Sequence, residues 1–154
     1  MSILGSIEKP KDRPPISTIC GDAGAGKTRL AATFPNPIFI RAEDGMQSIP
    51  AGERPDAFPV LRGPNASEVV SALFDQLIAL LREPHDYKTL VIDSVTALDE
   101  LFTAEALEKD GKAKTLATAL GGYGAGVQYV SSHHHRVRKA AQMLNERRGM
   151  TVVL

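Results

Sequence analysis

Residues 19–31 read ICGDAGAGKTRLA, and positions 21–28 of this stretch follow the pattern G-x-x-x-x-G-K-T. Glycines at this spacing allow backbone N–H groups to turn inward and surround an anion. The β-prone residues 16–20 precede the pattern, and residues 28–34 are expected to form a short helix whose N-terminus adds partial positive charge. Because the pattern requires a strand before it and a helix after it, this stretch predicts a phosphate-binding loop.

Two side chains of the loop have separate tasks toward the phosphates. Lys27 is expected to reach the outer phosphates and to act in catalysis, and the Thr28 hydroxyl is expected to bind Mg²⁺. A glycine-rich turn that arises by chance is the alternative, and the strand and helix on either side argue against it. The residues expected to bind the nucleotide are Gly21, Asp22, Ala23, Gly24, Ala25, Gly26, Lys27 and Thr28.

A second candidate is the carboxylate of Asp93, which ends the run KTLVID over residues 88–93. A continuous apolar run suits a central parallel strand that is buried on both faces. The carboxyl ends of such strands form the edge where α/β proteins bind ligands. Asp93 is therefore expected to hold Mg²⁺ through a water molecule, opposite Thr28. Its alternative role is to cap the following helix.

A third candidate is Glu43, at the acidic end of the expected strand IFIRAED over residues 38–44. A carboxylate at this edge can polarise a water molecule for in-line attack on the γ-phosphate of a nucleotide. The neighbouring Asp44 can take the same role. Otherwise Glu43 is a solvated charge at a strand end, and Asp44 is a turn residue before Gly45.

Strands and helices alternate along the chain, which predicts an α/β fold with a largely parallel sheet. Asn65 and Glu68 resemble a capping box at the start of a helix that Pro84 ends. Residues 109–126 are expected to form a loop, and Gly149 is expected to end a long amphipathic helix. The expected strands are 16–20, 38–44, a short one within 57–63, 88–93 and one that starts in 150–154, and the expected helices are 28–34, 69–81, 96–108 and 127–144.

The segments GDAGAGKT, FIRAEDGM and LVIDSVTAL resemble the RecA-like ATPases in their order and spacing. In that family a glutamate lies on the strand after the phosphate loop, and a serine follows the metal-side aspartate, as Ser94 follows Asp93. The segment GGYGAG and the helix after it are most similar to phage-type AAA/RecA-like ATPases linked to single-strand annealing recombination. The resemblance covers residues 16–154. It implies a three-layer αβα P-loop NTPase fold, with ATP and Mg²⁺ as cofactors. It also implies that Lys27 binds phosphate, that Thr28 and Asp93 bind the metal ion, and that Glu43 acts on water.

The resemblance also implies a DNA partner. Residues 121–126 fall where RecA-like proteins place a mobile DNA-contacting loop, and Tyr123, between Gly122 and Gly124, is placed to stack on a base. The alternative is a flexible lead-in to the next helix with an exposed tyrosine. The implied partners are single-stranded DNA, further copies of the chain and a single-strand-binding protein, in the cytoplasm of a bacterial or phage-infected cell.

Family resemblance further places the strand that begins at Thr151 between the phosphate-loop strand and the Asp93 strand. The family's γ-phosphate sensor, second DNA loop and further strands come after that strand and have no counterpart in the sequence. Residues 1–15 are therefore expected to form an N-terminal tail, and residues 16–154 a RecA-like ATP-binding domain that is incomplete at its C-terminus. Either the sequence is a fragment or the protein has lost these parts.

The composition argues against several other classes of protein. A content of 43% hydrophobic and 23% charged residues in 154 is that of a soluble globular domain. A formal net charge of zero gives no overall attraction to nucleic acid or to a membrane. The longest apolar runs are too short to span a bilayer. The single cysteine, Cys20, excludes an intrachain disulfide, suits a reducing cytoplasm, and is expected to pack on a buried strand.

Two other functions use the same kind of loop. One is a kinase of a small molecule or a nucleoside, although the segments between the strands show no clear arginine-rich lid. The other is a nucleotide-binding module that does not hydrolyse ATP and only orders a partner interface. A guanine-nucleotide switch is disfavoured because the base-reading motif N-K-x-D is absent.

The helix expected over 127–144 carries residue types that invite further interpretations. Histidines 133–135 point about 100° apart on a helix, so they do not converge on one metal ion, and His134 is expected to lie on the buried stripe. The basic residues are expected to form a solvated face. The alternatives are a contact with a DNA backbone or an arginine that reaches a neighbouring subunit's nucleotide. These residues are Arg136, Arg138, Lys139, Arg147 and Arg148.

Overall fold

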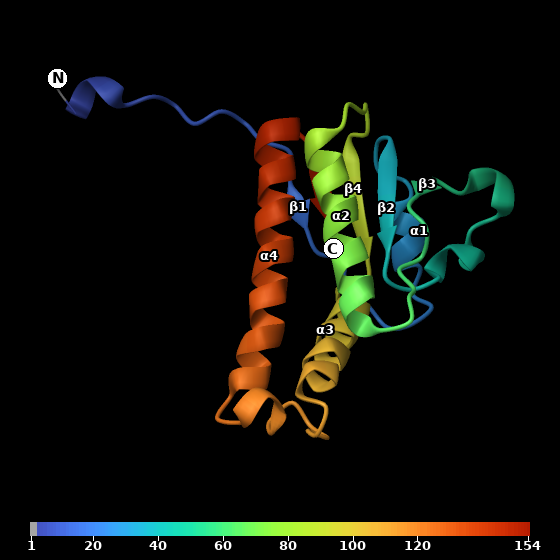
Figure 1. The fold of residues 1–154 in the computed structure, drawn as a ribbon. Helices are drawn as coiled ribbons and strands as arrows, with labels where there is room; N and C mark the ends of the chain where they lie inside the picture. Colours follow the sequence, from blue (N-terminus) through green and yellow to red (C-terminus); the bar gives the residue numbers. More distant parts are fainter. Residues whose placement is uncertain (1–2) are drawn as a thin grey trace.

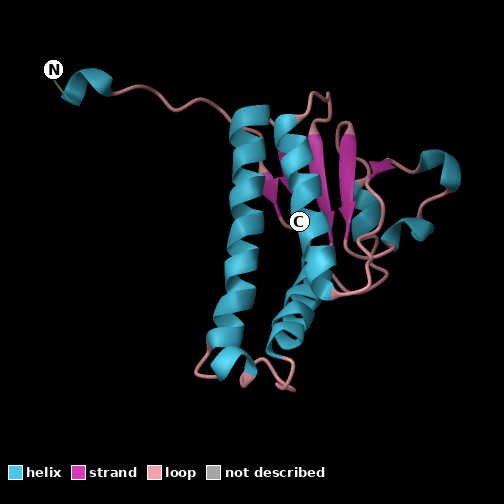
Figure 2. Ribbon diagram, viewed as in Figure 1, coloured by secondary structure: helices cyan, strands magenta, loops and turns pink. Residues whose placement is uncertain are grey.

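Five short strands form one sheet in which every neighbouring pair of strands is parallel, in the order β1-β5-β4-β2-β3. The computed structural model describes residues 3–154, and helices flank the sheet on both faces (Figures 1 and 2). The α/β fold expected from the alternating pattern is thus confirmed, and it has the layers of a P-loop NTPase. The strands and helices are β1 (Ile16–Ser17), α1 (Lys27–Ala31), β2 (Pro37–Arg41), β3 (Asp56–Ala57), α2 (Ala66–Arg82), β4 (Thr89–Asp93), α3 (Val95–Asp110), α4 (Ala125–Arg148) and β5 (Thr151–Val153).

The two faces of the sheet carry different layers because side chains alternate along each strand. On β4, Leu90 and Ile92 face the large core that α2, α3 and α4 complete. Val91 faces the opposite way, into a smaller core with residues such as Ala31 of α1 and Met46. Figure 1 shows α2 and α4 in front of the sheet and α1 behind it. Burial of β4 on both faces is the arrangement that its continuous apolar run predicts.

The last strand takes the place expected from the family resemblance. β5 lies between β1 and β4, and its register pairs Val152 with Ile16 on one side and with Leu90 on the other. The side chains of Val152 and Val153 are almost completely buried. The phosphate-loop strand and the Asp93 strand are therefore separated by one strand, and their carboxyl ends open on the same edge.

Two strands end earlier than the sequence suggests. β2 stops at Arg41: the N–H of Ala42 makes the last ladder bond, to the carbonyl oxygen of Asp93 at 2.8 Å, and the N–H of Glu43 turns to the same oxygen at 3.2 Å. β1 contains only Ile16–Ser17. The expected burial of Cys20 is consequently wrong, since this residue follows the strand and is exposed.

The other boundaries are shifted by a few residues. The short strand expected within 57–63 is β3, one residue earlier. Helix α1 ends at Ala31, before the expected residue 34, as Thr33 and Phe34 form turn bonds to the carbonyls three residues back. The loop expected over 109–126 begins after α3 ends at Asp110, contains the 3₁₀ turn η4 (Ala119–Gly121), and gives way to α4 at Ala125.

Helix ends follow the expected capping chemistry. The Asn65 side chain accepts the N–H of Glu68 at 2.9 Å, so the expected cap at the start of α2 is confirmed, and the Glu68 carboxylate bonds the side-chain amide of Asn65, also at 2.9 Å, in place of its backbone N–H. Gly149 ends α4 with a left-handed backbone, at φ 63°. Within residues 3–154, no helix is both long and apolar enough to cross a membrane.

Candidate functional site

Three segments meet at the edge formed by the carboxyl ends of the strands. The glycine loop follows β1, Asp93 ends β4, and residues 42–48 follow β2, which neighbours β4 on the side away from β5. β2 and β4 run in the same direction, so both deliver their following residues to this edge (Figure 2). The strand order therefore brings together residues that lie far apart in the sequence.

The glycine loop has a backbone that only glycine adopts easily. Gly24 and Gly26 have φ angles of +79° and +91°, and a Cβ at either position would meet nothing within 4 Å. Conformation, not space, therefore requires glycine at these two positions. Gly26 is also the N-cap of α1 and offers no side chain to cap the helix. The first N–H groups of α1 consequently have no intrahelical acceptor and suit an anionic ligand.

Lys27 lies folded over this loop. Its Nζ donates hydrogen bonds to the carbonyl oxygens of Gly21, at 2.6 Å, and Asp22, at 2.9 Å. The ammonium group is thus held beside the loop backbone by the loop itself. A positive charge at this point is what binding of the outer phosphates of a nucleotide requires.

The central contact of the site joins Thr28 and Asp93. The Thr28 Oγ1 donates a hydrogen bond to Oδ2 of Asp93 at 2.9 Å, across 65 residues of sequence. Burial raises the pKa of Asp93, and the charge of Glu43 raises it further, whereas the bond from Thr28 and the charge of Lys27 lower it. Two oxygen groups thus face each other beside the phosphate loop, as the sequence predicts.

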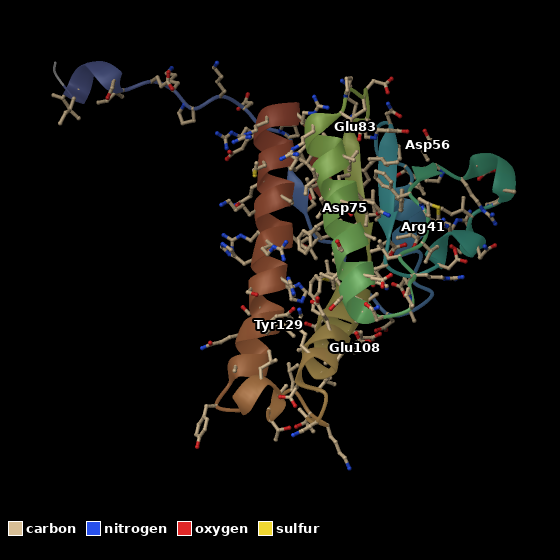
Figure 3. The ribbon with its side chains drawn as sticks, in the orientation of Figure 1. Arg41, Asp56, Asp75, Glu83, Glu108 and Tyr129 are labelled. Atoms are coloured by element: carbon tan, nitrogen blue, oxygen red, sulfur yellow. The ribbon has the colours of Figure 1, made fainter. Side chains whose placement is uncertain are left out.

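The two acidic residues after β2 lie differently. The N–H of Glu43 donates to the carbonyl of Asp93, and its exposed side chain is close enough for its charge to raise the pKa of Asp93. Asp44 instead lies within 3.5 Å of both Arg41 and Gln47. Arg41, at the end of β2 (Figure 3), thereby provides Asp44 with a positive partner. Of the two carboxylates, Glu43 is the one that the geometry associates with the Thr28–Asp93 pair.

Gly45 completes the site, and sequence reasoning assigned it no role beyond ending a turn. A Cβ at this position would lie 2.9 Å from Oδ2 of Asp93 and 3.0 Å from Oγ1 of Thr28. The only sequence signal is that a glycine directly follows the two carboxylates. Its closeness to both oxygens depends on tertiary structure and is not visible in the sequence.

The residues present fit Mg²⁺ and a nucleoside triphosphate. Mg²⁺ is usually held by one or two protein oxygens together with phosphates and water, and Thr28 and Asp93 supply such a pair. The space that a methyl group on Gly45 would fill lies beside both oxygens. Over residues 3–154, no three His, Cys, Asp or Glu side chains gather into a metal site of their own.

Comparison with known proteins agrees with this geometry. A family model described as an AAA domain matches residues 13–154. The chain belongs to the AAA-domain family. Searches of curated proteins and of solved structures find no match. Membership in the AAA-domain family indicates a nucleotide-binding domain of the ATPase type.

All candidate site residues lie inside the matched part of the AAA domain, but the structure brings only some of them together. The glycine loop, Lys27, Thr28, Asp93 and the backbone of Glu43 form one cluster. Tyr123 lies elsewhere, in the connection between α3 and α4, which extends beyond the edge of the sheet (Figure 1). It is fully exposed, with φ at +51°. The residues of this connection with positive φ are Gly111, Leu120, Gly121, Gly122, Tyr123 and Gly124.

The histidines of α4 serve packing in this AAA domain. His133, not His134, lies on the buried stripe, whereas Val130, Val137, Ala141 and Leu144 lie on it as expected and Val127 is exposed. The Nε2 of His133 lies 2.8 Å from Glu105, and Arg136 donates to its Nδ1 at 3.2 Å. His134 is half-buried and pairs with the exposed Asp99 at 2.9 Å.

The basic face expected on α4 is only partly free. The guanidinium of Arg136 stacks on Phe74, 3.8 Å from the ring centre. Arg148 donates to the carbonyl oxygens of Leu80 and Glu83 at the end of α2, so it caps that helix. Arg138, Lys139 and Arg147 remain exposed.

Proposed function

We propose that the chain binds and hydrolyses ATP with Mg²⁺ and acts on single-stranded DNA in recombination or repair, as a RecA-like protein that forms homo-oligomers. The observation that carries the proposal is the 2.9 Å contact between the Thr28 hydroxyl and the Asp93 carboxylate, next to Lys27 and the glycine loop. A phosphate-binding loop alone is compatible with any anion-binding protein. A hydroxyl and a carboxylate beside it supply the oxygens of a metal-dependent nucleotide site.

Each residue of the site has a distinct task. The glycine loop binds the phosphates through its N–H groups, and Lys27 exchanges its bonds to the carbonyls of Gly21 and Asp22 for bonds to the outer phosphate oxygens. Thr28 and Asp93 would hold Mg²⁺. The ion would supply positive charge that stabilises the negative charge of the phosphates.

Glu43 is the proposed catalytic base. Its backbone is fixed by the bond to the carbonyl of Asp93, while its side chain remains exposed at the edge of the site. A carboxylate in that place accepts a hydrogen bond from the attacking water and turns it toward the γ-phosphate. The pairing of Asp44 with Arg41 favours Glu43 over Asp44 for this task.

The connection between α3 and α4 supports the DNA part of the proposal. Tyr123 presents its ring entirely to solvent from a left-handed backbone, which costs a non-glycine residue about 1 kcal/mol. Gly122 and Gly124 on either side leave the ring free of neighbouring side chains. A free aromatic ring is the group that stacks on the bases of a single strand.

The test is the release of phosphate from ATP, with Mg²⁺, in the presence and absence of single-stranded DNA. The proposal predicts slow release that single-stranded DNA accelerates, and no release in EDTA. Release that requires a small-molecule acceptor would indicate a kinase. Tight ATP binding without any release would indicate a binding module, and equal rates with and without DNA would contradict the DNA role.

A further inference from the structure

Gly45 lies in a segment that is fixed on both sides. Before it, the N–H groups of Ala42 and Glu43 donate to the carbonyl of Asp93. After it, the side chains of Met46 and Ile49 are buried, at 3% and 4% exposure. The segment therefore has little freedom to retreat from the oxygens it covers.

Space, and not backbone conformation, requires glycine at this position. Gly45 is absent from the glycines with positive φ, so an alanine would adopt its backbone without strain. A Cβ there would nevertheless come within 3.0 Å of two oxygens that are already bonded to each other, Asp93 Oδ2 and Thr28 Oγ1. Real Cβ atoms essentially never lie closer than 3.0 Å to another heavy atom, so a neighbour would have to move.

Each movement that makes room for a methyl group at Gly45 would separate groups that the metal part of the site needs close together. If Asp93 or Thr28 rotates away, the pair of oxygens is lost. If the segment moves back, Glu43 moves with it, because the two residues lie only two positions apart. The backbone of the glycine loop is not the group that must move, since the three atoms nearest to the added methyl group belong to the side chains of Asp93 and Thr28.

We propose that Gly45 is a positioning residue for the metal part of the site, an inference that rests on the proposed nucleotide function. Its missing side chain allows the segment after β2 to lie against the Thr28–Asp93 pair and to bring Glu43 beside it. A side chain at this position selectively removes the contribution of Mg²⁺ to nucleotide binding, and it leaves the grip of the glycine loop on the phosphates intact.

The experiment compares Gly45→Ala with Gly52→Ala in the full chain. Gly52 lies seven residues further along the same connection, has no positive φ, and a Cβ there would meet nothing within 4 Å, so it is a matched control. ATP affinity is measured by equilibrium titration in Mg²⁺ and in EDTA. For Gly45→Ala we expect affinity in Mg²⁺ to fall by about 10–100-fold, as for other residues that orient metal ligands, with affinity in EDTA unchanged. Gly52→Ala should match the parent in both.

The outcomes separate this inference from the proposed function. If the parent does not bind ATP, the proposed function fails. If the parent binds and Gly45→Ala behaves like it in Mg²⁺, the positioning role is wrong. An equal loss in Mg²⁺ and in EDTA would also overturn it, because the glycine would then serve the loop or the fold.

A second measurement covers the case in which Gly45→Ala is too unstable to titrate. The free energy of unfolding is compared for Gly45→Ala in the parent and in an Asp93→Ala background. Without the Asp93 carboxylate the Thr28 hydroxyl is free to turn, so the methyl group should cost clearly less stability there. An equal cost in both backgrounds would show that the methyl group does not act on the Thr28–Asp93 pair, and it would overturn the inference.

Discussion

Asp93 is a carboxylate in an environment that disfavours its charge. It is half-buried at the end of β4, and burial raises its pKa while the nearby charge of Glu43 adds to the effect. A residue that only capped α3 would not need this position, and the hydroxyl of Ser94 already accepts the N–H of Ala97 at 3.3 Å as the helix cap. Asp93 therefore reduces stability at neutral pH, which is typical of residues placed for function.

The raised pKa predicts how stability changes with pH. Below the unfolded-state pKa, near the usual 3.8, the carboxyl group is neutral in both states and costs nothing. The pKa of Asp93 is higher in the folded state than in the unfolded state. As the pH rises from the unfolded-state pKa through the folded-state pKa, the unfolded state loses its proton more readily, and the free energy of unfolding falls. Asp93→Asn cannot ionise, so its stability relative to the parent should increase between pH 4 and pH 7, as measured by urea unfolding at both pH values. A relative stability that is constant or decreases over this range would contradict the assignment.

Glu43 provides the clearest test of chemistry at a single residue. Glu43→Gln keeps the size of the side chain and the backbone bond to Asp93, but an amide polarises water poorly. ATP affinity should be unchanged, and the steady-state rate of phosphate release should fall by about 10²–10⁴-fold. Asp44→Asn is the control and should retain most of the rate. The opposite pattern in the two variants would move the base to Asp44.

At the scale of elements, a buried polar cluster holds three helices together. Glu105 of α3 accepts a hydrogen bond from Ser67 of α2 at 3.0 Å and contacts His133 of α4 at 2.8 Å. Burial lowers the pKa of His133, and Arg136 donates to its Nδ1, so the ring is neutral and its Nε2–H donates to Glu105. Tyr129 lies between α4 and α3 beside this cluster, with its ring centre 4.7 Å from that of His133 (Figure 3).

Removal of Glu105 should therefore destabilise the fold without affecting the site. Glu105→Ala leaves Ser67 and His133 without their partner, and an unsatisfied buried polar group costs about 1–3 kcal/mol. Glu100→Ala, on the exposed side of α3, should cost less than about 0.5 kcal/mol. Urea unfolding measures both. Equal effects of the two substitutions would show that the cluster contributes no stability.

The connection between α3 and α4 yields a prediction for DNA binding. Tyr123→Ala should weaken binding of single-stranded DNA by about 1–3 kcal/mol, which is the value of one stacked base, and leave ATP affinity unchanged. Tyr123→Phe keeps the aromatic face and should bind like the parent. A fluorescence titration at low salt distinguishes these cases. If the alanine variant binds as tightly as the parent, the tyrosine does not contact the strand.

At the scale of the whole molecule, the position of β5 explains how the site forms. β5 lies between β1 and β4, so the glycine loop and Asp93 reach the same edge one strand apart. The α2–α4 layer covers one face of the sheet and the smaller core around Phe39 and Val91 covers the other. The site residues therefore depend on a sheet that is held from both sides.

Local patterns predict local features well. The spacing of the glycine loop, the apolar run that ends at Asp93 and the Asn65 cap each depend on neighbouring residues, and the structure agrees with all three. The order of the strands follows from the family resemblance and not from composition or periodicity.

Features that depend on contacts between distant segments are not predicted by the sequence. The role of Gly45 arises from contacts with Thr28 and Asp93, which lie 17 and 48 positions away. Cys20 is exposed because it follows β1 and the last backbone bond to the β5 segment, from the N–H of Ile19 to the carbonyl of Leu154. Spacings of three and four residues after Val130 both suit a helical stripe, so the sequence does not distinguish His133 from His134, and His133 is the one that contacts Glu105 of α3.

The central claim is that this AAA domain binds ATP through the glycine loop together with a metal site at Thr28 and Asp93. The most direct measurement is the ATP affinity of the parent and of Lys27→Ala, each with Mg²⁺, with Lys114→Ala as a control for an exposed lysine elsewhere. Loss of a charged hydrogen-bond donor to the phosphates should weaken binding by about 10–100-fold, while Lys114→Ala binds like the parent and all three chains unfold at similar temperatures. Wild-type affinity in Lys27→Ala would contradict the account.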